Sequence, residues 1–179
     1  MSASDLRGAT LLSIARDALA AVADGPPRWT EAWLNDPAAT FVTLRLDGEL
    51  RGCIGSIEAV RAIGDDVHSN ARAAAYRDPR FPPVALRELP SLEVEVSVLS
   101  PRSLLAAASE GEALAALRPG IDGLVLEYDG RRATFLPQVW ESLPDPAEFL
   151  AHLRLKAELP PRFWHPALRL SRYTVEKYT

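Results

Sequence analysis

The sequence predicts an α+β fold, with a mainly antiparallel sheet, helices packed on it and two lobes. Two short apolar runs are each split by Asp-Gly, the dipeptide that favours a tight β-hairpin turn. Each hairpin is followed by a helical pattern and then by another strand pattern. The chain has 179 residues, 47% of them hydrophobic, which suits one domain with a core that needs no metal or disulfide.

The N-terminal third is predicted to form a helix followed by a hairpin. Apolar residues at helical spacing predict a helix from Ser4 to Ala23, with Ser4 as its N-cap. β-Branched and aromatic residues then predict a strand over Phe41–Leu46. Asp47-Gly48 forms the turn, and Glu49–Ile54 is the return strand.

A second helix and a third strand complete the first half. Asp65 is expected to cap the helix, which ends before Asp78-Pro79 because a residue that precedes proline disfavours helical geometry. Apolar and polar residues alternate strictly over Leu92–Val98. This alternation predicts a strand with one buried face.

The second half repeats this order. The hairpin strands are expected at Leu124–Tyr128 and Arg131–Leu136, after a short helix capped by Ser109. Asp145-Pro146-Ala147-Glu148 combines an N-cap, a proline at the first helical position and a capping-box glutamate, so it predicts a helix start. Ala167–Val175 can form the last strand.

The similar order of elements suggests an internal duplication. The two Asp-Gly turns lie 82 positions apart, the two helix caps 80 and the two later strands 76. We therefore expect one domain over residues 1–179, with a candidate duplication of residues 41–100 and 123–176. Residue identity outside the turns is negligible, so chance similarity remains the alternative.

Several classes of protein are disfavoured by composition. Cys53 is the single cysteine, and the three histidines lack ligand spacing, so we expect no metal site. Neither a signal peptide nor a membrane span is recognisable, so we expect a cytoplasmic protein. The net charge is −8 over residues 1–150 and +4 over residues 151–179, but the basic residues are dispersed. Nucleic-acid binding by this tail is therefore a weak alternative.

The segment Leu50-Arg51-Gly52-Cys53-Ile54-Gly55 is the most unusual in the chain. Strand alternation places Arg51 and Cys53 on one face, where a guanidinium would favour the thiolate. Gly52 and Gly55 weaken a strand unless a bulge or a closely approaching ligand requires them. We predict Cys53 and Arg51 as catalytic residues and both glycines as ligand-binding residues. The alternative is that Cys53 is a small buried apolar residue, as most free cysteines are.

Four other side chains are candidates for the same site. Glu95 would join the catalytic residues if its strand neighbours Cys53, although a solvated position is the usual outcome for an alternating strand. Asn70 lies on or beside an apolar helix face, where its amide must bond to the fold or to a ligand. Arg80 could clamp an anion or pair with Asp78. Gln138 could supply an amide to a pocket.

The motif LRGCIG resembles that of the AMMECR family, in its stand-alone microbial form called AmmeMemoRadiSam system protein A. Three further segments match the family in the same order, and together they cover the chain from about Leu11 onward. They are Asn70-Ala71 with the loop Asp78–Pro83, the strand Glu93–Pro101, and Gly123 with Ala133–Trp140.

The resemblance implies a two-lobed α+β fold and an association with Memo-type dioxygenase-like and radical-SAM proteins. It implies no particular reaction and no cofactor. Many members have a second cysteine near the position of Arg154, and its absence here argues against a mechanism that needs two thiols.

Two kinds of function are compatible with these observations, and the sequence does not decide whether the protein is an enzyme. The first is a small-molecule site or a thiol-based catalytic site around LRGCIG. The alternative is a non-catalytic adapter, or a subunit that presents substrate to a Memo-like or radical-SAM partner.

Overall fold

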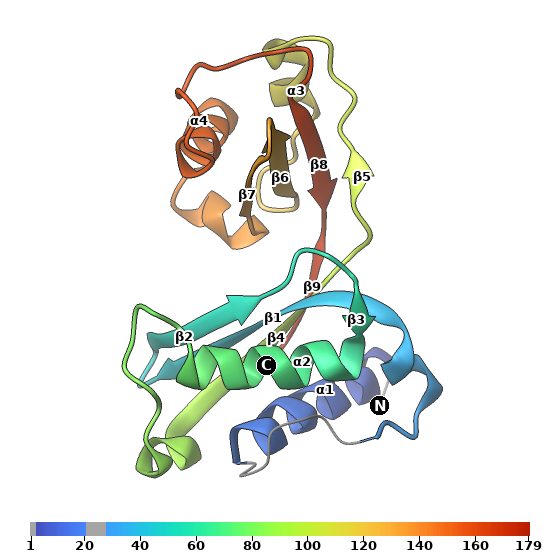
Figure 1. The fold of residues 1–179 in the computed structure, drawn as a ribbon, viewed down its shortest axis with the longest axis vertical. Coiled ribbons are helices and arrows are strands. Elements are labelled where there is room, and N and C mark those ends of the chain that lie inside the picture. Colours follow the sequence, from blue (N-terminus) through green and yellow to red (C-terminus); the bar gives the residue numbers. More distant parts are fainter. Residues whose placement is uncertain (1–2, 21–27) are drawn as a thin grey trace. The chain divides into compact units, whose positions relative to one another are not determined.

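The computed structural model describes residues 3–20 and 28–179, and the chain forms two compact units. Unit 1 consists of Met1–Leu99 with Glu176–Thr179, and unit 2 of Ser100–Val175. Both units combine antiparallel strands with helices, which confirms the predicted α+β class (Figure 1).

Unit 1 is built on a sheet with the strand order β2-β1-β4-β9. The central strand β1 (Pro37–Leu46) is antiparallel to β2 (Glu49–Gly55) on one side and to β4 (Leu92–Leu99) on the other. The short strand β3 (Arg61–Ala62) pairs with the beginning of β1, and β9 (Val175–Tyr178) pairs with β4. The Asp47-Gly48 turn has positive φ at both residues, as a type I′ hairpin requires.

Helices α1 (Ala3–Ala20) and α2 (Ile63–Tyr76) lie on the same side of this sheet (Figure 1). Their apolar residues pack with the alternate strand residues that point toward them, and the short helices η1 (Ala32–Asn35) and η2 (Leu86–Ser91) complete the unit. Central members of the core are Leu11, Ala15, Val42, Leu44, Val67, Ala71, Val94 and Val96. The strand residues between them point to the opposite face, called the outer face below.

Two helix starts differ from the prediction. Ser4 lies inside α1, and its hydroxyl donates to Glu176 instead of capping the helix. Helix α2 begins at Ile63, so Asp65 lies in its first turn, where the carboxylate accepts a bond from Trp29 Nε1 at 2.7 Å. An acidic residue is favourable both at the N-cap and in the first turn of a helix, so the presence of Asp65 does not show which of the two positions it occupies. Residues 21–23 of the first predicted helix lie outside the described residues.

Unit 2 has a four-stranded sheet with the order β5-β8-β6-β7. The predicted hairpin is formed by β6 (Gly123–Tyr128) and β7 (Arg131–Phe135), and β8 (Arg169–Tyr173) lies on the other side of β6. The two-residue strand β5 (Ser103–Leu104) pairs with β8. Both sheets therefore place the first hairpin strand between its return strand and a later strand, while the proposed duplication stays a prediction.

The helices of unit 2 begin where the sequence predicts. Ser109 caps α3 (Glu110–Ala116), and Asp145 caps α4 (Pro146–Lys156) by accepting bonds from two backbone N–H groups. Between β7 and α4, the short helix η3 (Pro137–Glu141) buries Trp140, whose ring stacks on Phe149 with the ring centroids 3.7 Å apart. These contacts fill the core of unit 2.

The last predicted strand, Ala167–Val175, is wrong in extent. The chain forms β8, interrupts the strand at Thr174, and continues as β9 in the sheet of unit 1. Alternation does not show that a strand changes sheets, because both parts keep the same period of two.

Tyr173 is a buried tyrosine at the end of β8, and its ring lies against Gly123. Its hydroxyl is 2.8 Å from Thr134 Oγ1 and 3.1 Å from the Phe135 carbonyl oxygen. Burial disfavours the phenolate and raises the pKa of Tyr173 to about 12. Unfolding exposes the phenol and returns it to its ordinary pKa of 10.0.

We expect this shift to make unit 2 sensitive to alkali. A raised pKa stabilises the fold fully below pH 10, and this contribution is lost as the pH rises through about 12. Between about pH 8 and pH 11, the free energy of unfolding should fall by about 1.4 kcal/mol more in the wild type than in Tyr173→Phe. Urea denaturation of both proteins measures this difference. Equal falls would show that the buried hydroxyl does not titrate as described.

Candidate functional site

Cys53 lies in β2 and points to the outer face of the sheet in unit 1. The strand register places Thr43 of β1 opposite Cys53 on one side and opposite Glu95 of β4 on the other. Directly opposed residues share a face, so these three side chains form a row across the sheet. The Thr43 hydroxyl donates to Cys53 Sγ at 3.3 Å, and Cys53 is a partly exposed free thiol. The structure thus brings Cys53 and Glu95, two predicted catalytic residues, onto one face.

A hollow of about 360 Å³ adjoins this row. Thr43, Arg45, Glu93 and Glu95 line it from the outer face, Arg16, Leu92 and Val94 line it from the helix side, and Thr179, which follows β9, also lines it. Glu95 Oε1 also lies 3.7 Å from Lys177 Nζ, which is ion-pair distance. The hollow offers a ligand cationic, anionic and hydroxyl groups, and Thr43 belongs to both the hollow and the thiol contact.

Arg80 and Asp78 hold the backbone of Cys53 at the edge of β2. The Cys53 N–H donates to Asp78 Oδ2 at 2.9 Å, and Arg80 Nη2 donates to the Cys53 carbonyl oxygen at 3.1 Å. Arg80 also donates through Nε and Nη2 to the buried Asp78 carboxylate. These bonds from Arg80 hold the pKa of Asp78 well below its usual range and raise the pKa of Arg80. Of the two alternatives for Arg80, the structure shows the pairing with Asp78.

Arg51 does not share a regular face with Cys53. The pairing passes from Leu44–Gly52 to Arg45–Leu50, which leaves Arg51 as the extra residue of a β-bulge. Its guanidinium instead contacts Glu88 at 2.9 Å and donates to the carbonyl oxygens of Pro82 and Pro83. The alternation that predicted a shared face is broken here. The positive charge of Arg51, which was expected to act on the thiol, is instead paired with Glu88 and with the carbonyl oxygens of Pro82 and Pro83.

Both glycines of LRGCIG have a packing role. A Cβ atom at Gly52 would collide with the backbone carbonyl oxygen of Ala74 in α2, and one at Gly55 would collide with the Phe41 ring. Helix α2 therefore packs directly on β2 at Gly52, and an aromatic ring covers Gly55. Their role as ligand-binding residues stays a prediction.

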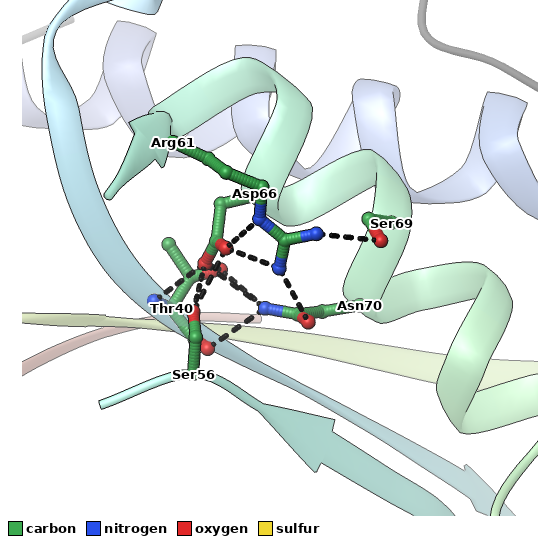
Figure 2. A network of polar contacts seen from close by, with 6 residues as sticks. All are labelled: Thr40, Ser56, Arg61, Asp66, Ser69 and Asn70. Carbon is green, nitrogen blue, oxygen red and sulfur yellow. Dashed lines mark hydrogen bonds and ion pairs between the residues drawn. The ribbon is translucent and has the colours of Figure 1, made fainter. Parts of the chain in front are cut away.

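Asn70 belongs to a buried polar network on the helix side of the sheet, which Figure 2 shows. Its amide donates to the Thr40 carbonyl oxygen at 3.0 Å and to Asp66 Oδ2 at 3.0 Å, and its Oδ1 lies 3.5 Å from Arg61 Nη2. Of the two alternatives for this amide, the structure shows bonding to the fold.

The centre of this network is Asp66, which is fully buried. Its carboxylate accepts bonds from the Thr40 backbone N–H and hydroxyl, from the Ser56 hydroxyl, and from Asn70. Arg61 forms an ion pair with it at 2.6 Å and also donates to Ser69 (Figure 2). The network joins β1, the turn after β2, β3 and α2.

The remaining candidate, Gln138, lies in η3 of unit 2, whereas the other candidates lie in unit 1. Sequence reasoning missed Thr43, Asp66 and Glu88. Only Asp66 had a local signal, because it precedes Asn70 by four positions and so faces the same side of α2. Thr43 and Glu88 gain their roles through contacts between distant segments.

Two properties of the whole described chain bear on function. Within residues 3–20 and 28–179, no three His, Cys, Asp or Glu side chains are grouped so that they could hold a metal ion. None of the helices over these residues has both the length and the apolar character needed to cross a bilayer.

The fold and the hairpin motif define this chain as a two-unit α+β protein of a known structural type. The uncharacterised protein PH0010 from Pyrococcus horikoshii superposes with a TM-score of 0.87 and 34% sequence identity, over 97% of this chain and 91% of that one. A model of the AMMECR1 family matches residues 12–178. The chain belongs to the AMMECR1 family, which confirms the predicted resemblance to the AMMECR family.

Two archaeal proteins are similar to most of this chain. Protein MJ0810 from Methanocaldococcus jannaschii is 44% identical over 137 residues, which are 73% of this chain and 66% of that protein. Protein TK0174 from Thermococcus kodakarensis is 38% identical over 162 residues, 84% of this chain and 77% of that protein. The chain thus spans about two thirds of the length of the first of these relatives.

Proposed function

We propose that the outer face of the sheet in unit 1 binds a small molecule in the hollow beside Cys53, which acts as a reactive thiol at its margin. The contact of Thr43 carries this proposal, because one side chain both lines the hollow and donates to the sulfur. A ligand seated against Thr43 and Glu95 therefore lies next to the thiol.

The surroundings of the sulfur suit a nucleophile. A hydroxyl that donates to sulfur stabilises the thiolate more than the thiol, and the thiolate is the nucleophilic form. Asp78 and Arg80 bond to both backbone groups of Cys53 and restrict its position. The Arg80 guanidinium lies near the thiol, and its charge is offset by the Asp78 carboxylate with which it pairs.

The rate at which iodoacetamide alkylates Cys53 tests this role, because the chain has a single cysteine. Thr43→Val has nearly the same shape but lacks the hydroxyl, whereas Thr43→Ser keeps it. We expect Thr43→Val to lower the native rate constant near pH 7 by about 3-fold to 10-fold, the effect of losing one hydrogen bond to the charged form. Thr43→Ser should stay within about 2-fold of the wild type.

Mass spectrometry follows the alkylation, and the urea-unfolded chain gives the reference rate of an unprotected thiol. If only the unfolded chain reacts, Cys53 is a packing residue and the proposal fails. Equal rates in the wild type and in Thr43→Val would also contradict it.

The adapter function is the alternative, and one observation favours it. Arg51, Asn70 and Arg80 are all engaged in holding the fold together. Co-purification with a Memo-like or radical-SAM partner tests this alternative. An adapter is expected to keep its partner in Cys53→Ala, whereas a thiol-dependent function would be lost in that variant.

A further inference from the structure

The hydrogen bonds of the Cys53 backbone show which backbone N–H and C=O groups of β4 point away from β1, toward the free edge of that strand. Because Cys53 directs its N–H and C=O to Asp78 and Arg80, these groups point away from β1. Thr43 opposite then directs its own backbone groups toward Glu95, and Glu95 directs its groups back toward β1. The neighbouring residues Leu92 and Val94 therefore direct their N–H and C=O toward the other edge of β4.

Strand β9 covers only part of this edge. The Ser100 N–H donates to the Thr174 carbonyl oxygen, and Lys177 reaches Glu95, so β9 runs back along β4 from its C-terminal end. Strand β4 has eight residues and β9 has four. This difference in length leaves part of β4 without a strand partner on this side among the described residues, and Thr179, which follows β9, lines the same hollow as Leu92 and Val94.

The hollow described above lies at this uncovered part of β4. Glu93 and Glu95 flank it on the outer face, with Arg45 beside them. On the helix side, a second hollow of about 390 Å³ is lined by Leu19, Leu89, Leu92 and Val94. The outer-face side of the edge thus carries two carboxylates together with Arg45 and Lys177. The helix side is mainly apolar, with Arg16 as the one charged residue among the described residues that line it.

We propose that this edge binds an extended peptide segment with alternating apolar and basic side chains, which continues the sheet from the end of β9. Its backbone pairs with Val94 and Leu92, its apolar side chains enter the hollow on the helix side, and its basic side chains face Glu93 and Glu95. This inference rests on the proposed function, because it uses the same hollow and takes the small ligand there to be a short extended peptide.

Backbone methylation of a probe peptide tests the strand pairing directly. The probe is acetyl-Val-Lys-Val-Lys-Val-amide, titrated into the full chain by calorimetry. An antiparallel strand whose valines face Leu92 and Val94 directs the valine N–H groups toward β4 and the lysine N–H groups away. We expect N-methylation of the central valine to weaken binding at least about 10-fold, and N-methylation of a lysine to change it less than about 3-fold. Equal effects at both positions would overturn the pairing.

Charge exchange tests the orientation of the peptide. Glu93 is exposed, so Glu93→Lys should fold normally. We expect this variant to bind the lysine peptide about 3-fold to 10-fold more weakly than the wild type does, and to prefer a matched peptide with glutamate in place of lysine. A Val-Thr-Val-Thr extension appended to Thr179 should occupy the same edge and abolish binding.

No binding at about 1 mM peptide would overturn this inference. The proposed function would still stand if Thr43→Val slowed alkylation of Cys53, because that measurement uses no peptide. Conversely, peptide binding with an unreactive Cys53 would leave the strand pairing valid and remove the thiol from the function.

Discussion

Gly52→Ala is expected to destabilise the folded protein by about 3 kcal/mol or more. The added Cβ would collide with the carbonyl oxygen of Ala74, which is backbone and cannot rotate away. Overpacking of a core costs about 1–3 kcal/mol where side chains can adjust, and here α2 itself must move from the sheet. The displaced helix also carries Asp66 and Asn70. Urea denaturation followed by circular dichroism measures this loss.

Gly111→Ala is the matched control, because that glycine lies in α3 with no atom closer than 4.0 Å to an added Cβ. Alanine favours helices over glycine, so the control should be neutral or slightly more stable. A Gly52→Ala protein as stable as the wild type would show that α2 does not pack so closely on β2. Gly52 would then be available for a role in ligand binding.

Asp66→Asn should be the second severe substitution, with a loss of about 3–5 kcal/mol in the free energy of unfolding. The change removes the negative charge opposite Arg61. It also turns one acceptor into an amide donor among groups that already donate, including Thr40 and Asn70. A buried donor without an acceptor loses the hydration that it has in the unfolded chain.

Arg61→Gln provides the comparison for this network. The Arg61 side chain is 41% exposed while that of Asp66 is 1% exposed, so water can replace some of the bonds of Arg61 but few of those of Asp66. We expect the arginine variant to lose about 1 kcal/mol, the usual range for a partly exposed ion pair. Both variants are compared by urea denaturation at neutral pH. If they lost the same amount, the network would depend on the ion pair alone.

Local sequence signals predicted the elements that local interactions determine. Both hairpins follow from Asp-Gly turns, since Asp47 and Asp129 adopt the positive φ that a type I′ turn requires. The start of α4 follows from Asp145, whose carboxylate bonds to nearby N–H groups in any context. In each case, the residues that interact are close in the sequence.

The site depended more on distant contacts. Cys53 and Glu95 were selected from their own segments, but only the strand register shows that Thr43 lies between them. Arg51 was assigned from alternation, and a one-residue bulge changes its direction. Asn70 was recognised as a buried amide, whereas its partners Thr40 and Asp66 depend on how β1 packs on α2. Periodicity within one segment contains no information about such pairings.

The return of the chain to its first sheet has a consequence for biosynthesis. Strand β4 is complete at Leu99, but β9 begins only at Val175, after the whole of unit 2. Because synthesis starts at the N-terminus, the edge of β4 that later pairs with β9 has no partner strand while residues 100–175 are still being synthesised. Nascent chains are exposed to edge-to-edge association during this interval, until β9 is made and pairs with part of that edge.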